Sequence, residues 1–390
     1  MAEREGKTLK NILIVDDSAL MRRVISDIIN KADELQAETT ASNGAEALSL
    51  LESGMKFDAI ILDINMPVMN GLEFLKVLNK KRMKEKVIVV STIATEGAKE
   101  TILALELGAF DFVTKPGSLS EAKGSVFGNR LREILCAATG IEYKNEESDE
   151  REVVPADSTP SAKDSLNSSL VQRTLSQKPI KNQSDRTKHS NSAAGKGKQK
   201  LVALACSTGG PKALQYVIPF LPANLDAAVL LVQHMPVGFT ASLSNRLNEL
   251  SRIHVKEAED GEVLQKGTVY IARGGSQMRL IESNKKEHHL SVKVEGARNG
   301  LKPCADIMYE SLKGSSFDDI TCVIMTGMGA DGTKGILELE KTNKIYVIAQ
   351  DEASCTVYGM PKAIAEAGAV DEVRVLKDIA DAITMHVGVQ

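Results

Sequence analysis

The chain has 390 residues, of which 43% are hydrophobic and 26% are charged, and its formal net charge is −4. A chain of this length is expected to hold two or three domains, and the composition is that of an ordinary globular protein. The acidic balance and the lack of Trp argue against a nucleic-acid surface, which needs basic side chains and aromatic stacking. No apolar run approaches the roughly 20 residues that span a bilayer, and the charged start MAEREGKTLK lacks the apolar core of a signal peptide.

The cysteines are odd in number and form no CxxC pair, so neither a disulfide framework nor a zinc site is expected. Free thiols fit a reducing compartment, and we therefore expect a cytoplasmic protein. The cysteines are Cys136, Cys206, Cys304, Cys322 and Cys355.

Composition divides the chain into two parts. The stretch from Asn145 to Lys200 is rich in Ser, Lys, Asn, Gln and Asp and has few large apolar residues. Such a segment cannot bury enough apolar surface to offset the entropy of ordering it. We therefore predict an N-terminal domain over residues 8–140, a flexible linker over 141–199 and a C-terminal domain over 200–390.

The N-terminal part alternates short apolar runs with amphipathic stretches, as in SALMRRVISDII (18–29) and GLEFLKVLNKKR (71–82). Five strands alternating with five helices predict a parallel, doubly wound α/β sheet of the flavodoxin type. The expected strands are NILIV (11–15), AETTA (37–41), DAIILD (58–63), KVIVVS (86–91) and DFVTK (111–115).

The C-terminal part shows the same alternation, which predicts a second, mainly parallel and Rossmann-like sheet. Two further segments, EVLQKGTVYIA (262–272) and MRLIESNKKEHHLSVKV (278–294), are expected to form inserted antiparallel hairpins. The expected sheet strands are LVALA (201–205), AAVLLVQH (227–234), DITCVIMTG (319–327), KIYVIAQ (344–350) and VDEVRVL (370–376).

Polar residues of the N-terminal part gather at the ends of the predicted strands, where an open α/β sheet has its ligand crevice. Asp16 and Asp17 follow the first strand, and Asp63 ends the third. Three carboxylates repel one another unless a cation joins them, and an all-oxygen site with few protein ligands suits Mg²⁺. Lys115 supplies a positive charge and Ser91 a hydroxyl for an anion near Asp63. The set predicts a phosphoryl acceptor, whereas any one of these residues alone could be a helix cap or a strand end.

The motifs DDS, DINMPVMNG, Ser91 and KP follow one another at these strand ends, and residues 10–135 resemble the receiver domain of two-component response regulators. The resemblance implies phosphotransfer from a histidine kinase to Asp63, with Mg²⁺ as cofactor. It also implies roles for individual residues: Asp17, Asp63 and the Asn65 carbonyl as direct metal ligands, Asp16 acting through water, and Ser91 and Phe112 as the switch hydroxyl and aromatic.

In the C-terminal part, the strand LVALA runs into CSTGGPK, so Ser207 lies where a strand gives way to a helix. A Gly-rich turn of this kind could cradle a phosphate on its backbone N–H groups, or it could hold a nucleophile on a sharp bend. Neither GxxxxGK[ST] nor GxGxxG is present, and the phosphate interpretation loses its main support.

A serine nucleophile needs a base and an orienting acid at neighbouring strand ends. His234 ends the strand AAVLLVQH, and Asp331 lies just past the strand DITCVIMTG. We predict that Ser207 attacks an acyl carbon, that His234 takes and returns the proton, and that Asp331 holds the imidazole tautomer. Two alternatives stay open: His234 could be structural and Asp331 a helix N-cap. The competing bases are His254, His288 and His289, of which the last two are expected to face solvent.

Five motifs then recur in order behind the receiver-like part: STGGPKAL, VQHMPVGFTASLSNRLN, GTVYIARGG, MTGMGADG and QDEASCTVYGMP. Residues 200–388 resemble the chemotaxis protein-glutamate methylesterase family. The resemblance implies hydrolysis of glutamate γ-methyl esters on methyl-accepting chemoreceptors and deamidation of receptor glutamines, without a cofactor for the ester chemistry. It implies Ser207, His234 and Asp331 as the catalytic residues, with the Met328 backbone N–H in the oxyanion hole. The chain order Ser, His, Asp differs from that of the common hydrolase folds.

The chain departs from the family pattern at Ala205 and Cys206, where the family usually has Gly and Ala, and at Arg273 and Gln277, where it tends to have Pro and His. We expect the loop of Arg273 and Gln277 to border the substrate and to bear on substrate preference. Three other readings compete: a catalytically inactive binding module, an esterase for a non-chemotaxis substrate, and a receiver-coupled transcription factor. The last lacks a basic recognition helix. Neither nucleic-acid binding nor membrane insertion is expected.

Overall fold

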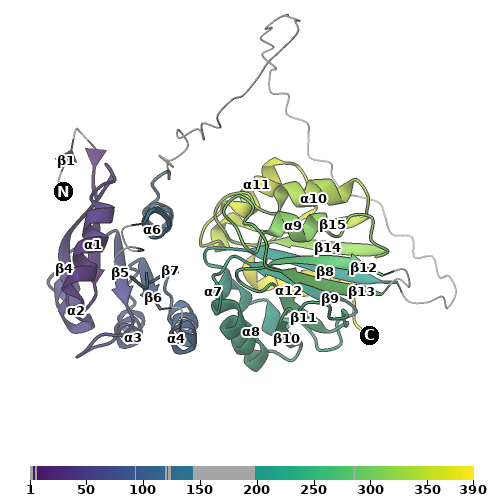
Figure 1. Ribbon diagram of the computed structural model, residues 1–390, viewed down its shortest axis with the longest axis horizontal. Coiled ribbons are helices and arrows are strands. Elements are labelled where there is room, and N and C mark those ends of the chain that lie inside the picture. The colour runs from purple at the N-terminus through teal and green to yellow at the C-terminus, as the bar shows by residue number, and fades with distance from the viewer. Residues whose placement is uncertain are drawn as a thin grey trace, which may run out of the picture. The chain divides into compact units, whose positions relative to one another are not determined.

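The N-terminal sheet has five parallel strands in the order β4-β3-β5-β6-β7, as the flavodoxin-type prediction requires (Figure 1). Its strands are β3 (Lys10–Val15), β4 (Leu35–Ala41), β5 (Ala59–Asp63), β6 (Val87–Ser91) and β7 (Asp111–Thr114). The helices that pack on it are α1 (Ala19–Ile29), α2 (Gly44–Glu52), α3 (Gly71–Lys81), α4 (Thr95–Glu106) and α6 (Ser125–Thr139). A short antiparallel pair, β1 (Glu3–Arg4) and β2 (Lys7–Thr8), precedes the sheet.

This computed structural model describes residues 3–4, 7–92, 94–118, 121, 124–143, 198–283 and 287–390. The predicted linker over residues 141–199 lies almost wholly outside these residues. Within them, no helix combines the length and the apolar character needed to cross a membrane.

The second sheet has seven parallel strands in the order β10-β11-β9-β8-β14-β15-β16, which confirms the predicted α/β class (Figure 1). The strands are β8 (Lys200–Cys206), β9 (Ala228–Gln233), β10 (His254–Glu257), β11 (Thr268–Ile271), β14 (Asp319–Ile324), β15 (Ile345–Gln350) and β16 (Glu372–Arg374). The connecting helices are α7 (Gly210–Leu214), α8 (Phe239–Leu250), α9 (Ala305–Glu310), α10 (Thr333–Glu340), α11 (Met360–Glu366) and α12 (Ile379–Val387), with short 3₁₀ turns at Ile218–Phe220, Glu352–Ser354 and Leu376–Asp378.

Strand β8 lies at the centre of this sheet and is buried on both faces. Its side chains alternate between two buried clusters: Leu201, Ala203 and Ala205 join one, and Val202, Leu204 and Cys206 join the other. Parallel sheets are typically covered by helices on both sides, so their strands read as continuous apolar runs. That pattern is the reason the central strands could be predicted from sequence.

Of the two predicted hairpins, one is confirmed and one is wrong. Strands β12 (Gln277–Glu282) and β13 (His288–Lys293) form the expected antiparallel pair. The segment EVLQKGTVYIA instead contributes β11, which pairs in parallel with both β9 and β10. All four residues of β11 are buried, and this short apolar run forms a strand of the parallel sheet in place of the expected hairpin. Strand β10 was not predicted.

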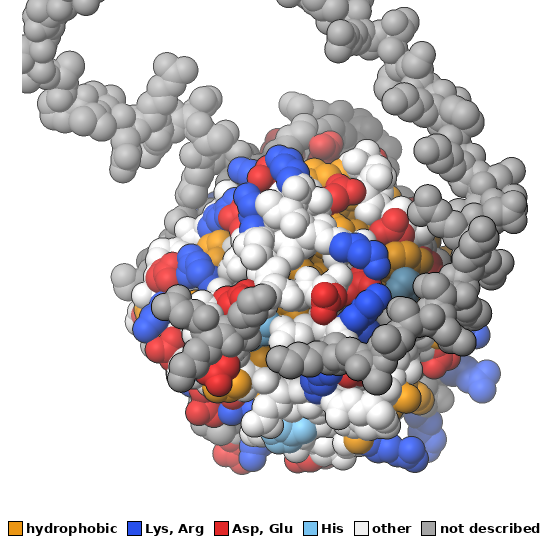
Figure 2. All heavy atoms as spheres, turned by 90° about the vertical axis from the view of Figure 1, so that its right-hand side faces the viewer, with side chains coloured by type: hydrophobic (Ala, Val, Ile, Leu, Met, Phe, Trp, Pro, Cys, Tyr) orange, Lys and Arg blue, Asp and Glu red, His pale blue; other side chains and the backbone are white. Residues whose placement is uncertain are grey.

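Figure 2 shows one side of the molecule, on which lysine and arginine side chains are interspersed with aspartate and glutamate side chains.

Candidate active site

Ser207 follows directly on the last residue of β8 and is held from both sides through its backbone. Its N–H donates to the Thr326 carbonyl at 3.0 Å, and its carbonyl accepts from Gly210 N at 2.7 Å and from Gln233 Nε2 at 3.0 Å. The residue is 5% exposed. The hydroxyl therefore sits on a firmly anchored turn at the carboxyl edge of the sheet.

The glycine pair after Ser207 has a steric explanation. Gly209 has a φ of +78°, in the left-handed region, and a Cβ there would lie 2.4 Å from Thr356 Cβ. A Cβ on Gly210 would lie 1.9 Å from Gln233 Oε1. Pro211 occupies the first turn of α7, where its missing N–H costs nothing. The motif therefore allows a tight turn and close packing of the Gln233 amide, and it is not a phosphate loop.

His234 and Asp331 form the buried pair that the sequence predicted. The distance from His234 Nε2 to Asp331 Oδ2 is 2.7 Å. With Nε2–H donating to the carboxylate, Nδ1 is left as the nitrogen that can take up a proton. Among the described residues no hydrogen bond joins Ser207 Oγ to His234, as is common before a substrate is bound.

Asp331 is held by four donors. Besides His234, it accepts from Ala305 N at 2.6 Å, Asp306 N at 3.0 Å and Cys304 Sγ at 3.1 Å. Burial acts to raise the pKa of Asp331, but the interaction with His234 and the backbone N–H groups outweigh it and lower the pKa to about 2. The carboxylate is thus ionised at neutral pH and suited to orient and stabilise an imidazolium.

The alternative role of Asp331 as the N-cap of α10 is not supported. Gly332 occupies the N-cap position, and the Asp331 carboxylate binds the N–H groups of Ala305 and Asp306 instead. Asp306 caps this helix, since its Oδ1 accepts from Gly332 N at 3.0 Å and from Gly335 N at 2.7 Å. Each carboxylate therefore binds the N-terminus of the other's helix. Asp331, which precedes α10, binds the first N–H groups of α9, and Asp306, which lies in α9, binds the start of α10. Sequence reasoning missed Asp306, which carried no signal beyond being a helical residue.

The competing histidines lie on other strands, and the thiol next to Ser207 is buried. His254 is exposed on the edge strand β10. His288, expected to face solvent, is buried: its ring stacks on Phe317 with centroids 4.0 Å apart, because one face of β13 packs inward. Cys206, next to Ser207, is fully buried, and this burial raises the pKa of its thiol well above the usual range. A thiol that stays protonated is a poor nucleophile.

The predicted oxyanion donor is compatible with its role. Met328 lies in the loop between β14 and α10, and Gly359 packs so closely that a Cβ there would lie 3.1 Å from Met328 Cα. Within the described part of the chain, the Met328 N–H has no hydrogen-bond partner, and neither has the N–H of Thr208. In α/β-hydrolases the N–H after the nucleophile also serves this purpose. Both donors are therefore free for a ligand.

The residues at which this chain departs from the family pattern differ in their burial and contacts. Gln277, which was expected in a loop beside the substrate, is fully buried: its Nε2 donates to Leu301 O at 3.1 Å, and its Oε1 accepts from Cys304 N at 2.9 Å. It therefore supports the segment that leads into α9. Arg273 is half-exposed and pairs with Glu257, with Nε 3.3 Å from Oε2, at the border of a 410 Å³ cleft beside α8. Ala205 is buried inside β8.

The acidic cluster of the N-terminal sheet is present. Carboxylate oxygens of Asp16, Asp17 and Asp63 lie within 4.8 Å of one another. Lys115 Nζ is 2.8 Å from Asp63 Oδ2 and 3.1 Å from Asp16 Oδ2. Burial raises the pKa of Asp63 despite the nearby Lys115 ammonium. Burial acts to lower the pKa of Lys115, but the carboxylates of Asp63 and Asp16 outweigh it, and the pKa of Lys115 is raised. A donor set of hard oxygens with one exposed carboxylate fits Mg²⁺.

The hydroxyl of the predicted switch residue Ser91 makes its hydrogen bonds away from this cluster. Ser91 Oγ donates to Gly97 O at 3.1 Å and accepts from Thr101 Oγ1 at 2.6 Å, both at α4. In the described residues it makes no hydrogen bond to Asp63. The Phe112 ring is buried, and the Asn65 side chain donates to Glu100 at 3.2 Å. The structure thus brings together the acids and the lysine, but not the hydroxyl.

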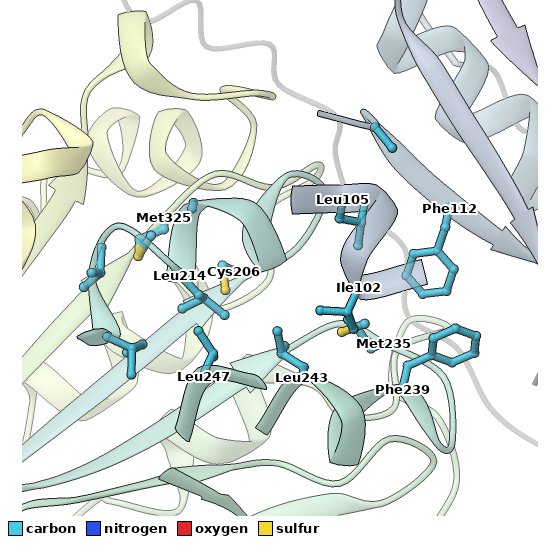
Figure 3. Packing of buried hydrophobic residues seen from close by; sticks show 14 of the residues in the cluster. Ile102, Leu105, Phe112, Cys206, Leu214, Met235, Phe239, Leu243, Leu247 and Met325 are labelled. Carbon is cyan, nitrogen blue, oxygen red and sulfur yellow. The ribbon is translucent and has the colours of Figure 1, made fainter. Parts of the chain in front are cut away.

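The segments Met1–Tyr143 and Lys198–Gln390 belong to one compact unit, and residues of the two segments touch close to the nucleophile. Thr208 Oγ1 donates to Asp111 Oδ2 at 2.7 Å, and the Phe112 and Phe239 ring centroids are 4.6 Å apart. Arg246 Nε lies 2.6 Å from Glu106 Oε1. Figure 3 shows the apolar part of this contact, which includes Ile102, Leu105, Phe112, Met235 and Phe239.

Comparison with known proteins agrees with this geometry. The family described as CheB methylesterase matches residues 202–383, and the response regulator receiver domain matches residues 12–126. The protein-glutamate methylesterase/protein-glutamine glutaminase of Bacillus subtilis is 41% identical over 375 residues, which are 96% of this chain and 97% of that protein. The protein of the same name from Archaeoglobus fulgidus is 37% identical over 383 residues, covering 97% and 98% of the two chains.

Two solved structures match the separate parts. The catalytic domain of Thermotoga maritima CheB methylesterase is 38% identical and covers 49% of this chain and all of that one, with a TM-score of 0.46. The response regulator domain of Thermotoga maritima CheB is also 38% identical and covers 35% of this chain and 99% of that one, with a TM-score of 0.30. On its close, nearly full-length relatives, the chain belongs to the protein-glutamate methylesterase/protein-glutamine glutaminase family and is a hydrolase that carries a response regulator receiver domain.

Proposed function

We propose that this chain acts in chemotaxis adaptation, removing methyl groups from glutamate γ-methyl esters on methyl-accepting chemoreceptors and deamidating receptor glutamines. The observation that carries the proposal is the buried His234–Asp331 pair, 2.7 Å apart, at the same sheet edge as the anchored Ser207 turn. The relatives that bear the methylesterase and glutaminase names span nearly the whole chain. We assign the receiver domain to residues 8–140 and the catalytic domain to residues 200–390.

In the proposed reaction, Ser207 Oγ attacks the ester carbonyl carbon while its proton passes to His234 Nδ1. The carbonyl oxygen becomes an oxyanion, which the Met328 N–H stabilises. Collapse of this intermediate breaks the bond to the methoxy group, which leaves as methanol with the proton from His234. Water then attacks the acyl-enzyme with His234 as base, and the glutamate carboxyl group and free Ser207 are restored. With a glutamine substrate the same steps release ammonia.

Asp331 stabilises the charged imidazole in both halves of the reaction. Its lowered pKa keeps it ionised when His234 becomes positive, so the two opposite charges meet inside a buried site. Electrostatic interactions are stronger where water is excluded. The residue does not itself need to take up a proton.

Regulation is proposed to act through Asp63, phosphorylated by a chemotaxis histidine kinase. Asp17, Asp63 and the Asn65 carbonyl would hold Mg²⁺, with Asp16 acting through water. The ion would neutralise charge on the incoming phosphoryl group. Lys115 lies against Asp63 and would pair with the phosphoryl oxygens. Ser91, now bonded toward α4, would turn to that group, and Phe112 would respond to the change.

The contacts next to Ser207 give this switch a means of action. Thr208, which follows the nucleophile, donates to Asp111 of β7, and Phe112 packs on Phe239. A receiver held in this way obstructs the site until phosphorylation changes β7 and α4. The cytoplasm is the proposed location, where the five free cysteines stay reduced.

The test is methanol release from methylated receptors by the full chain, with and without a phosphodonor and Mg²⁺. We expect release that is stimulated by the phosphodonor and lost in Ser207→Ala. Hydrolysis of simple esters without action on receptors would indicate a different substrate. No hydrolysis of any ester would identify the C-terminal domain as a binding module and overturn the proposal.

A further inference from the structure

The side chain of Gln233 connects the backbones of Ser207 and His234, the proposed nucleophile and the proposed base. Gln233 is the last residue of β9 and is 2% exposed. Its Nε2 donates to the Ser207 carbonyl at 3.0 Å and to the His234 carbonyl at 3.2 Å. Both protons of one buried amide are therefore used on the backbones of the nucleophile and of the base.

The other end of the amide is equally constrained. Its Oε1 accepts from Cys206 Sγ at 3.0 Å, and Cys206 is the Cα partner of Gln233 in the parallel pairing of β8 and β9. The amide fills the space beside Gly210, where an added Cβ would lie 1.9 Å from Oε1. The glycine after Gly209 is thus required by the glutamine, and the amide has no room to rotate away.

The two carbonyls depend on Gln233 to different degrees. The Ser207 carbonyl also accepts from Gly210 N at 2.7 Å. For the His234 carbonyl, the described residues supply no hydrogen bond other than the one from Gln233. Loss of the amide would leave this partly buried acceptor unpaired, and His234 would be free to shift relative to Ser207.

We propose that Gln233 is a positioning residue, which sets the separation of Ser207 and His234 by binding both of their carbonyls. The inference rests on the proposed roles of these two residues. Proton transfer from Ser207 to His234 is sensitive to a displacement of one ångström or less. The Gln233 side chain binds backbone carbonyls and not the Ser207 hydroxyl or the His234 ring, so we expect its loss to affect turnover and not substrate binding.

The decisive variant is Gln233→Met, which keeps the length of the side chain and removes its hydrogen bonds. Tyr270→Phe is the matched control: Tyr270 is also 2% exposed, and its hydroxyl accepts from Gln265 N at 2.9 Å, away from Ser207. Methanol release is measured on a peptide that carries a glutamate γ-methyl ester. We expect kcat to fall about 100-fold in Gln233→Met, with KM within about twofold. The control should lose thermal stability and keep its kcat.

Two comparisons make the result decisive. If Gln233→Met does not fold, Gln233→Glu replaces it, because a carboxyl group keeps the shape but can donate at most one proton, so at least one of the two carbonyls loses its hydrogen bond. A kcat within about twofold of wild type in the folded variant, or an equal fall in Tyr270→Phe, would overturn the inference. Wild-type hydrolysis that does not depend on Ser207 would overturn the proposed function instead.

Discussion

Asp331→Asn tests the central electrostatic feature of the site. The substitution keeps the size of the side chain and removes its charge. The pKa of Asp331 is lowered from 3.8 to about 2 in the folded chain. A difference of about two units corresponds to about 2 kcal/mol of folding free energy at neutral pH. The amide also turns an N–H toward one of the four donors, which leaves that donor unpaired at a further cost of about 1–3 kcal/mol.

The pH dependence gives the sharper test. A carboxyl with a depressed pKa stabilises the fold fully above its unfolded pKa, and this stabilisation is lost as the pH falls from about 4 to about 2. With these pKa values, about half of the charge contribution of Asp331 remains at pH 3. The difference in free energy of unfolding between wild type and Asp331→Asn should therefore be smaller at pH 3 than at pH 6 by about 1 kcal/mol.

Denaturant unfolding of both proteins at the two pH values measures this difference, and methanol release measures kcat. We expect kcat to fall by on the order of 10⁴, because the imidazole loses its orienting carboxylate. An unfolding difference that is the same at pH 6 and pH 3 would refute the depressed pKa. A kcat within about tenfold of wild type would refute the role of Asp331 in catalysis.

Three further outcomes are expected. Ser207→Ala should fold normally and leave residual catalysis of about 10³ over water, and His234→Ala should cost about as much, as measured by methanol release; full activity in Ser207→Ala would exclude that residue as nucleophile. Asp63→Asn should take up no label from a small phosphodonor, and wild-type labelling would place the acceptor elsewhere. The fragment 199–390 should be more active than the unphosphorylated full chain and insensitive to phosphodonor, whereas equal turnover would rule out obstruction by the receiver.

Sequence alone predicted the five strands of the first sheet, five of the seven strands of the second sheet, and the polar residues at their carboxyl edges. Strands buried on both faces read as continuous apolar runs, and a polar residue at the end of such a run is conspicuous. Ser207, His234 and Asp331 each follow a run of this kind, as do Asp16 and Asp63. Because parallel strands end at one edge, their sequence positions predicted that His234 would meet Asp331 and that Lys115 would meet Asp63. They did not predict that the Ser91 hydroxyl would bond toward α4.

Only the tertiary structure decided how these residues are held. Gln233 could be seen as a polar residue ending an apolar strand, but its two carbonyl partners depend on the register of β8 and β9. The exchange of carboxylates between Asp306 and Asp331, the burial of Gln277 and the parallel pairing of β11 depend in the same way on neighbours far along the chain. Local patterns report which face of an element is apolar. The partner of a buried polar group is selected by packing between elements, which no local pattern contains.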